Sequence, residues 1–145
     1  MKSTHGYISE YNQLHKEFDA IYHATAVRLG LSDCAFWILY MLHESNEQCK
    51  QSDLSGNAFM PPQTINSALK KLEKDGLVTM KRTPGKMGKS IHLTESGEYF
   101  VNENILPIIS AEEKACASFS EKEIETFLDL FRSLVKRLEK EIGNV

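Results

Sequence analysis

The chain has 145 residues, 41% of them hydrophobic and 26% charged, a composition typical of one globular domain and not of a disordered chain. Its longest apolar run, Ala35–Leu42, is shorter than the roughly 20 residues of a membrane span, and no secretory signal is visible. The three cysteines are scattered and form no disulfide framework. We therefore expect a cytoplasmic protein with reduced thiols. The net charge of −3 conceals a basic segment, since residues 61–90 carry seven Lys and Arg against two acidic residues. Such a segment favours a phosphate-bearing partner, although a solvated helix face explains it equally well.

Three helices are predicted in the first 60 residues. Apolar residues at spacings of three and four predict a long amphipathic helix over 7–29, and Gly30 ends it. Ser32 is suited to cap a second helix over about 33–44. This second helix has no polar face, so we expect it to be covered on both sides. A short helix over about 51–58 follows.

A helix and a hairpin are predicted next. A proline at the first position and a glycine after the end delimit a helix over 62–75. Residues 77–82 and 90–93 alternate like two short strands, and 83–89 form the turn between them. The order helix, helix, helix, strand, turn, strand across 32–94 is that of a winged helix-turn-helix.

Two further helices are predicted towards the C-terminus. The segment from Thr94 to about Phe119 is expected to be helical with a kink near Pro107, which lacks an amide hydrogen. Ser120 and Glu123 match a capping box, and the helix that follows carries a heptad seam of apolar residues over about three repeats, which requires a partner helix. The predicted fold class is therefore mainly α with a small two-stranded β wing.

The helix over 62–75 has two chemically different faces. Its inward stripe on a helical wheel consists of Ile65, Ala68, Leu69 and Leu72. The opposite face and its flanks carry Gln63, Thr64, Asn66, Ser67, Lys70, Lys71 and Lys74. Asn and Gln can pair bidentately with adenine, Ser and Thr reach base edges or phosphates, and Lys neutralises the backbone, so this face suits the major groove of DNA. An ordinary exposed face has the same residue types, but the proline turn before the helix and the basic hairpin after it favour DNA.

Four short motifs, spread over the chain in order, resemble landmarks of the MarR-type regulators, which are bacterial winged-helix transcription factors. They are Gln51–Leu54, Gln63–Asn66, Leu72–Val78 and Leu93–Gly97. The resemblance covers essentially the whole chain. It implies a homodimer in which residues 1–30 and 95–145 form an interlocking helical dimerisation region, while 31–94 form the domain that binds double-stranded DNA.

The resemblance also implies which residues contact DNA. By position, the helix residues that contact DNA are Gln63, Thr64, Asn66, Ser67 and Lys70, and Lys71 flanks them. The hairpin residues are Lys86 and Lys89. Many members of the family have an acidic residue followed by arginines in the hairpin, where this chain has Gly85–Lys89. Because lysine lacks the planar fork of arginine and the glycines leave the tip flexible, we expect salt-sensitive affinity from the hairpin and little sequence discrimination.

A small aromatic or amphipathic effector is a further implication of the resemblance. Tyr22, Trp37 and Tyr40 are the candidate pocket residues, although an aromatic cluster is more often simple core. Cys34, at a helix start where the dipole can lower a thiol pKa, is the best candidate for a redox sensor. A buried, inert thiol is the favoured alternative.

Other kinds of site find little support. His15, Asp19 and His23 share a helix face but extend over about 12 Å, too far for one ion, so no metal is expected. No nucleophile–base pair or glycine-rich phosphate loop has a meaningful spacing, so we expect no enzyme, no catalytic residue and no cofactor. The sequence predicts a dimeric DNA-binding regulator, acting as a repressor on a pseudo-palindromic operator. The alternatives are a winged-helix module that binds proteins and not DNA and, less favoured, a thiol-based sensor enzyme.

Overall fold

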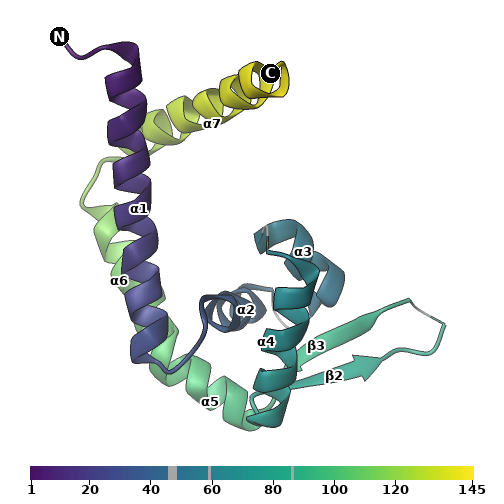
Figure 1. Ribbon diagram of the computed structural model, residues 1–145. Coiled ribbons are helices and arrows are strands. Elements are labelled where there is room, and N and C mark those ends of the chain that lie inside the picture. Colours follow the sequence, from purple (N-terminus) through teal and green to yellow (C-terminus); the bar gives the residue numbers. More distant parts are fainter. Residues whose placement is uncertain (46–48, 59, 86) are drawn as a thin grey trace. The chain divides into compact units, whose positions relative to one another are not determined.

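The computed structural model describes residues 1–45, 49–58, 60–85 and 87–145, which form two compact units, 1–105 and 106–145. The elements of the first unit are α1 (Thr4–Arg28), α2 (Asp33–Glu44), β1 (Cys49–Lys50), α3 (Gln51–Ala58), α4 (Pro62–Lys74), β2 (Val78–Arg82), β3 (Lys89–Leu93) and α5 (Glu95–Asn104) (Figure 1). The second unit contains α6 (Leu106–Ala117) and α7 (Glu121–Gly143). The predicted fold class, mainly α with a β wing, is confirmed.

Helix α2 is the centre of the core of the first unit. Its buried residues are Cys34, Ala35, Phe36, Ile38, Leu39 and Leu42. The helix packs against α1, α3, α4, α5 and β3, which confirms that more than one of its sides is covered. Within the described part of the chain, no single helix is long and apolar enough to cross a membrane. Helices α1 and α2 reach that length and composition only as a pair, and they are bent by 90°.

Glycines end α1 and α4 as predicted, through the same pattern of hydrogen bonds. Gly30 has a φ of 71°, and its N–H donates to the carbonyl of Val27 while the N–H of Leu31 donates to that of Ala26. This is the Schellman motif, which favours glycine because other residues are strained at positive φ. Gly76, with a φ of 76°, repeats it after α4 and turns the chain into the hairpin.

The sheet has three antiparallel strands in the order β1–β3–β2. The β2–β3 hairpin pairs residues from Val78 with Leu93 to Arg82 with Lys89. Strand β1 adds a third, short ladder in which Cys49 pairs with Ile91. The predicted two-stranded hairpin is confirmed, and β1 is a third strand that the sequence analysis did not predict, because two residues are too few to show the alternation from which a strand is recognised.

The start of α5 is fixed against the end of α4. The Thr94 hydroxyl accepts a hydrogen bond from the Gly97 N–H at 3.0 Å and donates one to the Gly76 carbonyl at 2.5 Å, while the Thr94 N–H donates to the Leu77 carbonyl at 3.0 Å. A Cβ atom on Gly97 would lie 2.0 Å from the carbonyl oxygen of Leu77. Glycine is therefore required here, because the two backbones approach too closely for a side chain.

The helix predicted from Thr94 to about Phe119 is two helices. The break falls at Ile105, and Pro107 is the second residue of α6, where its missing amide hydrogen removes no helical hydrogen bond. The expected kink is therefore a break two residues earlier. Helix α7 begins with the predicted capping box, in which the N–H of Ser120 donates to the Glu123 carboxylate at 2.8 Å.

Candidate nucleic-acid interface

The inner face of α4 fixes the rotation of this helix about its axis. Its four predicted core residues are Ile65, Ala68, Leu69 and Leu72, and all of them are buried. Through them the helix packs against α2, α3 and β2. The predicted inward stripe is confirmed. Because this stripe is held in the core, the opposite side of α4 must face solvent.

The outer face of α4 consists of polar and basic side chains, all exposed as expected for a binding surface. We define it as Gln63, Thr64, Asn66, Ser67, Lys70 and Lys71. Among the described residues, these side chains form no ion pair and no side-chain hydrogen bond, so their donors and acceptors are available to a ligand. No side chain caps the first turn of α4, and uncapped amides at a helix start attract anions.

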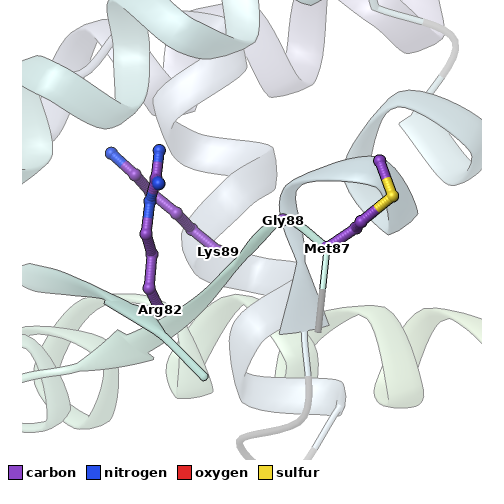
Figure 2. Close-up of a pocket in the computed structure, with 4 residues that line it drawn as sticks. All are labelled: Arg82, Met87, Gly88 and Lys89. Atoms are coloured by element: carbon purple, nitrogen blue, oxygen red, sulfur yellow. The ribbon is translucent and has the colours of Figure 1, made fainter. Parts of the chain in front are cut away.

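The β2–β3 hairpin lies beside α4 and extends beyond the helices of this unit (Figure 1). A pocket of about 330 Å³ on the hairpin is lined by Arg82, Met87, Gly88 and Lys89 (Figure 2). Figure 2 shows the Arg82 and Lys89 side chains extending to the same side, with Met87 at the other end of the pocket. Lys86, the second predicted hairpin contact, lies outside the described residues.

Arg82 is a site candidate that sequence reasoning missed. It belongs to the basic segment 61–90, but the hairpin contacts that the resemblance implies are Lys86 and Lys89. The strand register, in which Arg82 pairs with Lys89, brings it to the same face as the predicted lysine. The predicted turn over 83–89 conceals this pairing, because strand β3 begins at Lys89, one residue before the predicted strand.

The three predicted effector-pocket residues lie together. The ring centroids of Tyr22 and Trp37 are 4.9 Å apart and those of Trp37 and Tyr40 are 5.3 Å apart. The fully buried Phe36 contacts all three rings, and Phe18, which sequence reasoning missed, extends the cluster at 5.2 Å from Tyr22. Because the three predicted rings are only half-buried, the α1–α2 junction presents an aromatic surface on top of the core.

The cysteines differ in exposure. Cys34 and Cys49 are buried and Cys116 is exposed. Burial raises the pKa of the Cys34 thiol, so the expected lowering by the helix dipole does not prevail. Burial and the negative charge of Asp53 together raise the pKa of Cys49 to about 11. Both buried thiols are therefore protonated at neutral pH, which is the state of an inert core cysteine.

Two of the three histidines of α1 lie beside carboxylates. His15 Nε2 lies 3.5 Å from Asp19, and His23 Nδ1 lies 2.8 Å from Asp33 at the start of α2. Within the ranges that the structure describes, no group of three or more His, Cys, Asp or Glu side chains is arranged to hold a metal ion. The His23–Asp33 pair instead connects α1 to α2.

Comparison with known proteins identifies the domain and the fold. The sequence model of a family described as winged helix-turn-helix DNA-binding matches residues 38–79, and no curated protein matches the chain. The S. aureus MepR–DNA complex superposes with a TM-score of 0.75 at 18% identity, over 91% of this chain and 96% of that one. NMB1585, a MarR family regulator from Neisseria meningitidis, has a TM-score of 0.73 at 21% identity, over 93% and 97% of the two chains.

A third similar structure contains a small molecule. It is CouR from Rhodococcus jostii RHA1 bound to p-coumaroyl-CoA, with a TM-score of 0.69 and 18% identity over 85% of this chain and 87% of that one. At sequence identities of 18% to 21%, the similarity to these three structures is a similarity of fold alone. The chain has the winged helix-turn-helix fold that is seen in structures of MarR family regulators.

Proposed function

We propose that the chain is a MarR-type transcriptional regulator that binds double-stranded DNA through the outer face of α4. The observation that carries this proposal is the orientation of α4. Its buried stripe fixes the helix in the domain so that amide, hydroxyl and ammonium groups cover the opposite side, without partners among the described residues. These are the groups that hydrogen-bond base edges and neutralise phosphates in a major groove.

A homodimer is part of the proposal, with 1–30 and 95–145 as the dimerisation region and 31–94 as the DNA-binding domain. Helices α1 and α7 both carry large apolar side chains that are exposed in the single chain. On α1 these include Leu14, Phe18 and Ile21, and on α7 they include Phe127, Leu130 and Ile142. Exposed apolar surface of this extent is typical of an interface. A two-fold axis would place two α4 helices about 34–36 Å apart, which suits a pseudo-palindromic operator.

Release from DNA by a small aromatic or amphipathic effector completes the proposed function, with the protein acting as a repressor. The half-buried rings of Tyr22, Trp37 and Tyr40 offer the stacking surface that such a molecule needs. They lie on α1 and α2, so one ligand would contact both the proposed dimer region and the core helix behind α4. The effector must bind the DNA-free arrangement more tightly, since equal affinity for both arrangements shifts nothing.

The proposal is tested by two kinds of substitution in the α4 outer face, measured by fluorescence anisotropy on duplex DNA. Replacing Lys70 and Lys71 with Ala should weaken binding to every sequence and lower the slope of log affinity against log salt by about one per lysine in each subunit. Asn66→Ala should instead relax preference at particular base pairs, at a cost of about 1–3 kcal/mol.

The matched control is Lys114→Ala, which removes the same charge from an exposed position on α6 and should leave the salt slope unchanged. If the wild-type chain shows no salt-dependent binding to duplex DNA, the proposal is wrong and a winged-helix module that binds proteins is the better account. If Lys114→Ala weakens binding as much as the α4 variants, the assignment of α4 is wrong.

A further inference from the structure

The solvent side of α5 is acidic and has an aromatic residue at its centre. Five exposed residues at the helical spacing i, i+3, i+4, i+7 and i+8 form this side of the helix. We define the α5 outer face as Glu95, Glu98, Tyr99, Asn102 and Glu103. The side chain of Tyr99 is 70% exposed. Among the described residues, none of the five side chains forms an ion pair or a side-chain hydrogen bond, so the negative charge of this face is not neutralised there.

The sheet presents a basic side to solvent. Cys49, Val78 and Ile91 are buried, so their neighbours along each strand lie on the opposite face of the sheet. We define this outer sheet face as Lys50, Thr79, Lys81, Ser90 and His92. In the strand register the two lysines lie on either side of Ser90, whose hydroxyl oxygen is 2.9 Å from Nε2 of His92. Two ammonium groups therefore flank a polar, hydrogen-bonding centre.

The two lysines of the outer sheet face have no anionic partner in the part of the chain that the structure describes. Lys50 and Lys81 form no ion pair there. The carboxylate of Asp53 lies nearby, but it accepts a hydrogen bond from the backbone N–H of Lys50 at 2.9 Å and does not contact the ammonium group. The sequence has no acidic residue between Asp75 and Glu95, so β2 and β3 supply no anion.

The two faces match in charge and in size, and they are neighbours in the fold. Helix α5 follows β3 directly and packs against it. Glu95 and Glu103 are about 12 Å apart along the helix, and Lys50 and Lys81 are about 10 Å apart across two strand spacings. Two copies related by a two-fold axis can therefore each place the acidic face on the basic face of the other. We propose that the outer sheet face of one chain docks on the α5 outer face of a second copy of this chain.

The proposed contact is separate from the dimer seam of α1 and α7, and it links one dimer to the next. Both chains of a dimer carry both faces, so the contact can join dimers in a row. Tyr99 supplies contact area at the centre, and Glu98 and Glu103 supply carboxylates for the lysines. Exposed ion pairs are individually weak, so the contact should be transient in solution and should strengthen where neighbouring DNA sites hold two dimers close together. That role on DNA rests on the proposed function, whereas the docking itself does not.

Sedimentation equilibrium of the full chain without DNA tests the contact. At low salt the average mass of the wild type should rise with protein concentration. At high salt it should become independent of concentration, because salt screens exposed charges. The sheet variant, Lys50→Glu with Lys81→Glu, places carboxylates opposite carboxylates and should weaken the association by at least roughly tenfold. A wild-type mass that does not change with concentration at low salt would overturn the proposal.

Exchanging the charges of the two faces is the sharper test. The helix variant, Glu98→Lys with Glu103→Lys, should also lose the association, because both faces are then basic. Combining the helix variant with the sheet variant makes the two faces opposite in charge again, so this four-residue variant should recover the association. It overturns the proposal if it is folded by circular dichroism and does not associate.

The matched control is Lys114→Glu with Lys136→Glu, which reverses two exposed lysines on α6 and α7, outside both faces. This control should associate like the wild type. If it loses the association as fully as the sheet variant does, the effect is one of net charge and the proposed docking is wrong.

The outcomes separate this inference from the proposed function, because the test uses no DNA. If the wild type binds duplex DNA but its mass does not change with concentration, only the docking is wrong. If the chain associates as expected and the exchanged charges restore the association, but the chain does not bind duplex DNA, the docking stands and the proposed function is wrong.

Discussion

Gly97 lies against the backbone of Leu77, and this contact explains two of the motifs that the sequence shares with MarR-type regulators. The motif Leu93–Gly97 supplies the cap Thr94 and the small residue Gly97, and the motif Leu72–Val78 supplies the turn against which they pack. Together these residues make one junction between α4, the β2–β3 hairpin and α5.

Substitution of Gly97 should therefore be costly. Gly97→Ala would place a methyl group 2.0 Å from a carbonyl oxygen, so the backbones must separate, and we expect a loss of about 1–3 kcal/mol in the free energy of unfolding. Chemical denaturation measures this directly. Gly143→Ala is the control, because nothing lies within 4 Å of its added Cβ, and it should be neutral or slightly stabilising. Equal stability of the two variants would contradict the proposed close packing.

The thiols should differ in reactivity. With a soluble disulfide reagent at about pH 8, the exposed Cys116 should react rapidly, whereas Cys34 and Cys49 should react only as the protein opens. The reason is burial, which shields both sulfurs and raises the pKa of each, to about 11 for Cys49. Mass spectrometry of the labelled peptides identifies the sites. Rapid labelling of Cys34 would show that it is an accessible thiolate and restore it as a sensor candidate.

At the scale of the helices and strands, periodicity and end signals determined most of the predictions. The apolar stripe of α4, the glycines after α1 and α4, and the capping box of α7 are local features, and the structure confirms each of them. Strand β1 could not be predicted, because its two residues pair only with the distant β3. The exposed face of α4 could be predicted from the same periodicity. The position of Arg82 beside Lys89 could not, because it depends on the strand register of the hairpin.

The capping box of α7 gives a pH dependence. The Glu123 carboxylate accepts hydrogen bonds from the Ser120 N–H at 2.8 Å and the Ser120 hydroxyl at 3.0 Å, and these lower the pKa of Glu123 below its ordinary value of 4.5. Because the folded pKa is depressed, the stabilisation is present above the ordinary pKa and is lost as the pH falls through the folded one.

NMR titration of the Glu123 carboxyl carbon measures this shift. The wild type should titrate below the ordinary glutamate value, and Ser120→Ala should move the midpoint upward because one of the two donors is removed. Amide protection in the first turn of α7 should decrease over the same pH range. A midpoint at or above the ordinary value in the wild type would show that the capping box does not form in solution.

At the scale of the whole molecule, the proposed dimer accounts for apolar side chains that a monomer would leave in water. Phe127 is 63% exposed on α7 and belongs to the predicted heptad seam. Phe127→Asp should therefore shift the protein towards monomer in sedimentation analysis, because burying a charge in the seam is costly. Lys136→Asp introduces the same residue on the polar side of α7 and should leave the dimer intact. If both variants sediment like the wild type, the seam is not the interface.

Selection of bound duplexes from a random pool tests the central claim most directly. Two α4 helices related by a two-fold axis should enrich a symmetric consensus whose half-sites are centred about one turn of DNA apart. Asn66→Ala should loosen that consensus at defined positions. Lys70→Ala should lower the amount of bound duplex that is recovered and leave the consensus sequence unchanged. A pool that shows no enrichment, or one that yields a single asymmetric site bound by one chain, would contradict the account.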